Sequence, residues 1–224
     1  MRNPWQDIDV RKDSLLIHPG DLAHVDAFNN LHLKNKHYTI PYHLPPLPYV
    51  GRPEAPVLIL LANPGLSDKE AKLNFKYPPK VLEENHRNLL HLPPGNFDGE
   101  DSTAPFSRFQ DGWWHKRVRK LVDSTSIRRI ESGLFFVNFH PYHSRSWKSI
   151  LFTLPTQHYS FELVRRALKR NCIVLMSRNT EGWITAIPEL SDYKNKYNFL
   201  SPRGVYISPK NLPPGVFKKV VSSI

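Results

Sequence analysis

The chain has 224 residues, with 31 Lys and Arg against 20 Asp and Glu, which gives a formal net charge of +11. This length suits one domain with a substantial core, and the basic excess favours a polyanionic partner, nucleic acid above all. Charge that only keeps the protein soluble is the alternative. The single cysteine, Cys172, excludes an intrachain disulfide and any metal centre built from several cysteines.

The chain shows no targeting or membrane signal. Its first 20 residues lack the apolar centre of a signal peptide, and no apolar run approaches the length needed to span a bilayer. We therefore expect a cytoplasmic protein with no membrane partner.

Four short apolar runs predict buried strands. They lie, in chain order, at residues 57–62, 133–139, 172–177 and 205–208. None alternates polar with apolar residues, which is typical of parallel strands covered by helices on both faces.

Helical patterns separate these runs. They cover residues 81–92, 112–122, 159–171, 180–190 and 213–224. The alternation predicts a single α/β domain over residues 1–224, a three-layer α/β/α structure with a central four-stranded parallel sheet. Residues 1–54 are expected to be a lead-in packed on this domain, and the Gly/Pro/Asp-rich segment 93–105 to be an exposed loop.

Polar residues follow each predicted strand. They are Asn63-Pro64-Gly65, then Asn138 with the segment 139–144, then 177–179, then 208–211. Ligands of open parallel sheets bind beyond the carboxyl ends of the strands. We therefore expect these four groups to meet around one site.

Three of these segments together resemble a known family. The sequences LLANPG, FFVNFHPYHS and YISPKN are similar, in order and spacing, to motifs of the uracil-DNA glycosylase superfamily, in the branch with Asn-Pro-Gly. From about Leu44 onward the chain also resembles a group of glycosylase-like bacterial proteins without an assigned substrate. The resemblance implies four parallel strands flanked by helices and removal of a base from DNA.

Two positions depart from the family pattern. Tyr206 replaces the histidine of the last motif, which stabilises the departing base, and Ile207 replaces its first proline. We expect Tyr206, or His143 near the second motif, to donate a hydrogen bond to the base instead; a surface histidine is the alternative.

Asn63 is the predicted catalytic residue. An amide is too weak a base to take a proton, but it can orient a water toward the sugar carbon. Pro64 would stiffen the turn, and Gly65 would allow the backbone to approach the base. An ordinary turn after a strand is the alternative.

Further residues are predicted to contact the base. The resemblance places an aromatic ring near Phe75, where it would stack on the base. Asn138 could present a donor and an acceptor to the base edge, and Tyr142 lies nearby. A core phenylalanine and a local backbone contact are the alternatives for Phe75 and Asn138.

Ser208, Lys210 and Asn211, with Arg178 after the third strand, are predicted to hold DNA phosphates. The predicted helix 112–122 presents basic residues beside an apolar stripe and could contact DNA as well. A solvated surface is the alternative for both groups.

Together the patterns predict a monomeric, monofunctional DNA glycosylase that excises uracil or a modified pyrimidine without a cofactor or metal. Its role would be DNA repair or defence against phage with modified DNA. A non-catalytic nucleic-acid-binding module and a hydrolase of free nucleosides remain alternatives.

Overall fold

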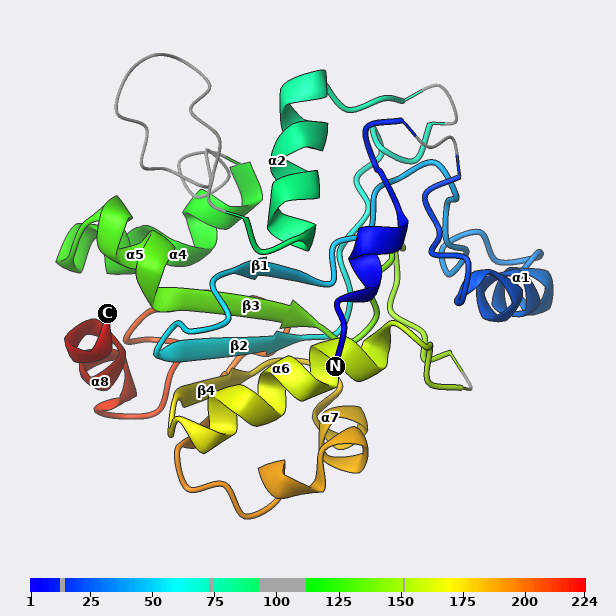
Figure 1. Ribbon diagram of the computed structural model, residues 1–224. Helices are drawn as coiled ribbons and strands as arrows, with labels where there is room; N and C mark the ends of the chain where they lie inside the picture. Colours follow the sequence, from blue (N-terminus) through cyan, green and yellow to red (C-terminus); the bar gives the residue numbers. More distant parts are fainter. Residues whose placement is uncertain (13–14, 73–74, 93–111, 151) are drawn as a thin grey trace.

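A mixed sheet of five strands lies at the centre of the computed structural model (Figure 1). The structure describes residues 1–12, 15–72, 75–92, 112–150 and 152–224, so the predicted loop 93–105 lies outside the described residues. The strands are β1 (Tyr49–Gly51), β2 (Val57–Leu61), β3 (Leu134–Asn138), β4 (Ile173–Met176) and β5 (Lys196–Asn198). Their order is β1-β3-β2-β4-β5, with β1 antiparallel to β3 and the other pairs parallel.

The predicted α/β class is confirmed, but the predicted four-stranded, all-parallel sheet is wrong. Three of the predicted strands correspond to β2, β3 and β4, whereas residues 205–208 form no strand. Val205 and Ile207 are buried in a helix-lined core, and the Ile207 amide donates to the carbonyl of Arg117 in a helix rather than to a strand. The fourth parallel strand is β5, whose residues are only partly buried.

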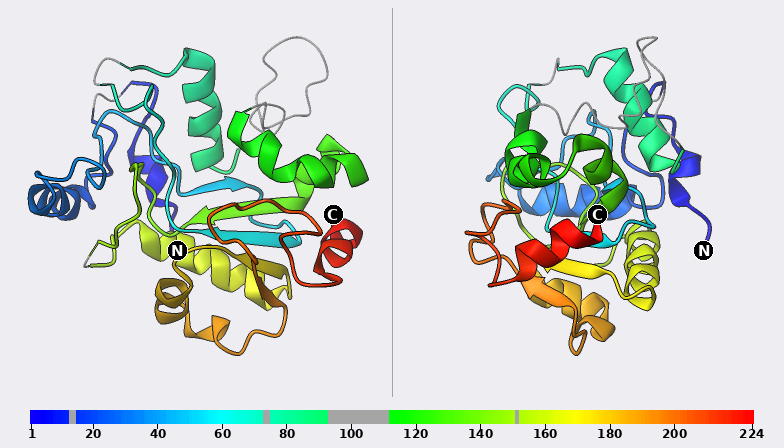
Figure 2. Two further views of the ribbon diagram at one scale, coloured as in Figure 1. Left: turned by 180° about the vertical axis from the view of Figure 1, so that it is seen from behind. Right: turned by 90° about the vertical axis from the view of Figure 1, so that its left-hand side faces the viewer.

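Helices cover both faces of the sheet. On one face lie α6 (Gln157–Lys169) and α7 (Thr180–Ala186); on the other lie α4 (Gly112–Ser124), α5 (Ile127–Gly133) and α8 (Val216–Ser223) (Figures 1 and 2). Leu58 and Leu60 of β2 point to the first layer, and Val57 and Ile59 to the second. All four are buried, which explains why the strand shows no polar alternation.

The first 54 residues pack on this framework. They contain the 3-10 helix η1 (Pro4–Asp7), α1 (Leu22–Leu31) and strand β1. Trp5 is fully buried and meets the Tyr142 ring edge-on at 6.5 Å between centroids. The segment thus contributes to the core on the face that α6 covers. A second 3-10 helix, η2 (Pro188–Leu190), follows α7.

Helix α2 (Pro79–Leu89) lies beside the edge strand β1 (Figure 1). The Asn88 side chain donates from Nδ2 to the Tyr49 carbonyl at 2.7 Å and accepts from the Gly51 amide at 3.4 Å. The amide therefore pairs with the strand edge much as another strand would.

Gly51 provides a test of this edge. Its φ is 103°, and a Cβ there would lie 2.2 Å from the Leu134 carbonyl oxygen. We expect Gly51→Ala to lower the free energy of unfolding by about 2 kcal/mol or more, measured by denaturant titration. Gly65→Ala is the control, because a Cβ there would meet no atom within 4 Å. Equal stability of the two variants would contradict this account of β1.

Candidate functional site

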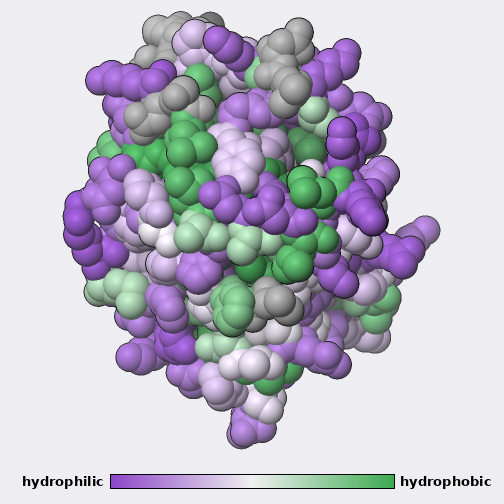
Figure 3. Space-filling view, turned by 90° about the vertical axis from the view of Figure 1, so that its right-hand side faces the viewer, coloured by the Kyte–Doolittle hydropathy of each residue, from purple (hydrophilic) through white to green (hydrophobic). Residues whose placement is uncertain are grey.

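A cavity of about 670 Å³ lies beyond the carboxyl ends of the parallel strands. Asn63 reaches it from the end of β2, Asn138 from β3, Arg178 from the end of β4 and Arg203 from the segment after β5. Its volume lies within the range of small-molecule sites, about 300–1,000 Å³. Figure 3 views the molecule from the side toward which the parallel strands run; apolar patches lie across the middle of this face, with hydrophilic side chains between them and around the margins.

Hydrogen bonds join residues 63–65, which line the cavity, to residues 143–144, of which His143 lines it. Asn63 Nδ2 donates to Ser144 Oγ at 2.8 Å, and the Ser144 amide donates to the Pro64 carbonyl at 3.3 Å. His143 Nδ1 lies 2.7 Å from the Gly65 carbonyl oxygen. A carbonyl only accepts, so Nδ1 carries the proton and Nε2 is a proton acceptor in the neutral ring.

These bonds settle which way the Asn63 amide points. Ser144 Oγ uses its only proton to donate to the Ser146 carbonyl at 3.0 Å, so toward Asn63 it is an acceptor. Asn63 Nδ2 also donates to the Pro64 carbonyl at 2.9 Å. Among the described residues no hydrogen bond reaches Asn63 Oδ1, which is therefore the polar atom this residue can offer to a water or ligand.

Asn138 is held in a similar way. It is the last residue of β3, opposite Leu61 in the register, and its side chain is 2% exposed. Nδ2 donates to the Leu47 carbonyl at 2.7 Å, and Oδ1 has no hydrogen-bond partner among the described residues. Asn138 therefore offers an acceptor rather than the predicted donor and acceptor together.

Tyr142, predicted to contact the base, does not line the cavity. It is buried, and its hydroxyl donates to Asp21 Oδ2 at 2.7 Å and accepts from the His18 amide. Burial and the Asp21 carboxylate hold the pKa of Tyr142 well above its usual value. The residue ties the N-terminal segment to the core, and we assign it this structural role instead.

Phe75 and Tyr206, which were also predicted to contact the base, do not line the cavity. Phe75 packs edge-on against Tyr77 at 4.9 Å between centroids, and Tyr77 is the one that lines the cavity. Tyr206 is 43% exposed, with the Arg117 guanidinium 4.3 Å from its ring centroid. Tyr77 and Val205, rather than Phe75 and Tyr206, therefore line the cavity.

The predicted phosphate contacts divide into two groups. Arg178 lines the cavity, together with Arg145 and Arg203, which the sequence did not single out. Ser208, Lys210 and Asn211 do not line it. Asn211 donates to the carbonyls of residues 204 and 206 and accepts from the Ser201 amide, so its amide organises the loop and is not available to a phosphate.

The structure adds acidic and amide groups to the cavity wall. Glu84 and Asn85 come from α2, and Glu70 follows the Asn-Pro-Gly turn. Burial alone would raise the pKa of Glu70, but hydrogen bonds from Ser67 and Tyr77 outweigh it and leave the pKa below its usual value. A sequence signal existed for Asn85, because Val81, Asn85 and Leu89 lie on one helix face and place an amide among apolar residues.

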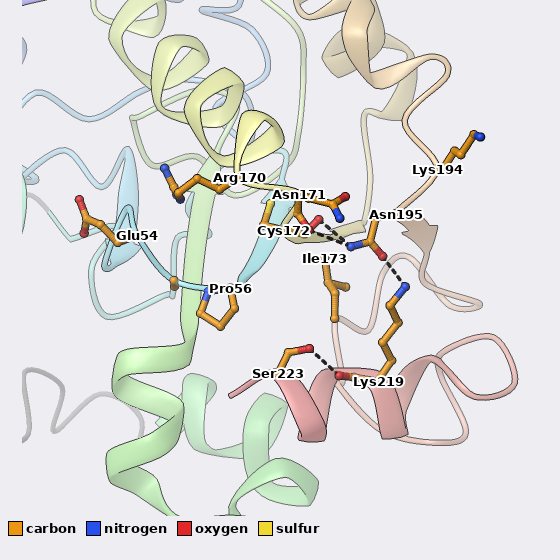
Figure 4. Close-up of a pocket in the computed structure, with 11 residues that line it drawn as sticks. Glu54, Pro56, Arg170, Asn171, Cys172, Ile173, Lys194, Asn195, Lys219 and Ser223 are labelled. Atoms are coloured by element: carbon orange, nitrogen blue, oxygen red, sulfur yellow. Dashed lines mark hydrogen bonds between the residues drawn. The ribbon is translucent and has the colours of Figure 1, made fainter.

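A second hollow of about 700 Å³ lies at the opposite, amino ends of the strands (Figure 4). Lys219 Nζ donates to Asn195 Oδ1 at 2.7 Å, and Asn195 Nδ2 donates to the Cys172 carbonyl at 3.1 Å. Lys194 points away from the other residues drawn (Figure 4). Burial raises the pKa of the Cys172 thiol to about 11, which removes the thiolate at neutral pH.

Comparison of the chain with protein-family models, with curated proteins and with solved structures finds no significant match. In the described part of the chain, no three or more His, Cys, Asp or Glu side chains form a group that could hold a metal ion. No helix among the described residues is long and apolar enough to cross a membrane. The geometry of the cavity therefore carries the functional argument.

The Cys172 thiol gives a test of whether the amino-end hollow holds a reactive group. We expect iodoacetamide at pH 8 to alkylate Cys172 about 100-fold more slowly in the native protein than in the unfolded chain, because a pKa higher by about two units leaves that much less thiolate. The native rate should then rise with pH toward 10. The chain has one cysteine, so mass spectrometry counts the product directly. Rapid native labelling at pH 8 would instead indicate a reactive thiolate in this hollow.

Proposed function

We propose that the protein is a DNA glycosylase that hydrolyses the N-glycosidic bond of a damaged or modified base, uracil and modified pyrimidines being the classes that the sequence resemblance implies. The supporting observation is the fixed orientation of Asn63. Its nitrogen is committed to Ser144 and Pro64, which leaves Oδ1 to hold a water beside the cavity.

The reaction would proceed by attack of this water on the sugar C1′. The water oxygen bonds to C1′ while the C1′–N bond breaks and its electron pair leaves with the base. Asn63 Oδ1 accepts a hydrogen bond from the water and directs it, without taking its proton. His143, which lines the cavity and is held by its Nδ1 bond to the Gly65 carbonyl, is the group we assign to receive the proton.

The charged groups around the cavity suit a sugar that develops positive charge during the reaction and a negatively charged DNA strand. Glu70 lines the cavity, and its lowered pKa keeps it ionised, so its negative charge would favour positive charge that develops on the sugar. Three arginines that line the cavity, Arg145, Arg178 and Arg203, could contact the phosphates beside an extruded nucleotide.

The fold and the net charge favour a DNA glycosylase over a hydrolase of free nucleosides. Strands β2 to β5 form a four-stranded parallel unit between helices, as the resemblance to the superfamily implies, with β1 added at one edge. The +11 charge favours a polymeric anion over free nucleosides. A non-catalytic binding module would keep the arginines but would not need a water held beside Asn63 for attack on the sugar.

Two variants test the water-binding role. We expect Asn63→Ala to lower base release by about 100-fold or more, because the water loses its position. Ser144→Ala removes one hydrogen bond that orients the amide and should cost about 10-fold. The assay uses duplex and single-stranded oligonucleotides with a panel of modified bases, and alkaline cleavage counts the abasic sites. DNA affinity should stay within a few-fold in both variants.

Ser149→Ala is the matched control for Ser144→Ala. Ser149 lies in the same segment, its hydroxyl donates only to the carbonyl of Ile150, and it does not line the cavity. Full activity of Asn63→Ala would contradict the mechanism. DNA binding by the unaltered protein with no abasic sites on any substrate would identify a binding module, and release from free nucleosides alone would identify the nucleoside hydrolase.

A further inference from the structure

Two buried asparagines on the cavity wall have hydrogen-bonded nitrogens and unpartnered oxygens. Asn85 and Asn138 are each 2% exposed and both line the cavity. Asn85 Nδ2 donates to the Pro46 carbonyl at 3.2 Å, and Asn138 Nδ2 donates to the Leu47 carbonyl at 2.7 Å. Neither Oδ1 has a hydrogen-bond partner among the described residues.

The orientation of both amides is fixed by their partners. Backbone carbonyls only accept, so turning either amide over would set its oxygen against the oxygen of Pro46 or Leu47. Because these two carbonyls belong to adjacent residues, one backbone segment anchors both amides. Leaving a buried acceptor without a donor costs free energy, which a ligand N–H group would recover.

Asn88 shows that this arrangement is specific to the cavity. It lies one turn after Asn85 on α2 and is also buried, but it does not line the cavity. Its nitrogen and its oxygen both have backbone partners in β1.

We infer that the cavity selects a base with an exocyclic amino group, such as a cytosine-type or adenine-type base, over uracil or thymine; this rests on the proposed base-excision function. An amino group offers two N–H donors on one nitrogen, which suits the two unpartnered acceptors of Asn85 and Asn138, both of which line the cavity. Uracil and thymine offer a single N–H between two carbonyl oxygens, and those oxygens would face the lone pairs of Asn85 and Asn138. The preference thus follows from unpaired acceptors rather than from cavity size.

Binding to oligothymidylates that differ at one central nucleotide tests this preference without relying on catalysis. The pairs are cytosine against uracil and adenine against hypoxanthine, because each pair exchanges an amino group for a carbonyl oxygen at one ring position. Asn63→Ala serves as the binding protein because its base release is expected to be slow relative to the binding measurement. We expect at least about 10-fold tighter binding of the amino member of each pair.

Asn85→Leu should reduce this preference to within about 2-fold, because it removes one acceptor while keeping a side chain of similar size. Asn88→Leu is the matched control: it removes a satisfied amide from the same helix and should lower stability while keeping the preference. Folding of each variant is checked by circular dichroism. If Asn85→Leu does not fold, the binding of the two nucleotide pairs to Asn63→Ala still tests the preference for an amino group.

Equal binding of both members, or tighter binding of the carbonyl member, would overturn the inference. The excision assay reports separately on the proposed function. Release of uracil with no amino preference would keep the glycosylase and reject the amino-base selectivity. A clear amino preference without base release on any substrate would keep the selectivity as a binding property and reject the catalytic role.

Discussion

The candidate site depends on the hydrogen bonds between residues 63–65 and 143–144. These two segments follow the neighbouring strands β2 and β3, whose ladder continues past the strand ends as the amides of Phe139 and His140 donate to the carbonyls of Leu61 and Ala62. The side-chain bonds then orient Asn63 and His143 over the end of the sheet. The paired ends of β2 and β3 therefore hold the turn at residues 63–65 in place, so that its side chains keep a fixed orientation.

Asparagine side chains hold much of this molecule together, and their hydrogen bonds divide them into two groups. Asn29, Asn88 and Asn211 are buried, and each uses both ends of its amide on the backbone. Asn85 and Asn138 are more deeply buried but use only the nitrogen. The first group ties loops and edges together, whereas both members of the second line the cavity. An incomplete hydrogen-bond set at such burial costs stability, which is typical of residues retained for binding.

Sequence patterns predicted the parts of this arrangement that depend on local or strand-level features. The apolar runs located β2, β3 and β4, and the strand-end rule selected Asn63, Asn138 and Arg178, which line one cavity. Strand β5 was missed because an edge strand of Lys, Tyr and Asn has no apolar run. The contribution of α2 was missed for another reason. The helical pattern places Asn85 on an apolar face, but this face reaches the cavity only because the helix lies beside β1, which no local pattern encodes. Tyr142 looked like part of the site because it precedes His143, yet it points into the core toward Asp21.

Cavity size alone would not have identified the site. The hollow at the amino ends of the strands is as large as the cavity at the carboxyl ends, about 700 against about 670 Å³. In the amino-end hollow, Lys219 and Asn195 are hydrogen-bonded to each other, and the Cys172 thiol is protonated at neutral pH. In the carboxyl-end cavity, the side-chain oxygens of Asn63, Asn85 and Asn138 have no partner among the described residues, although the side-chain nitrogen of each one is hydrogen-bonded. Of these two hollows, only the carboxyl-end cavity is lined by buried side-chain oxygens without a partner among the described residues, which favours it as the candidate site.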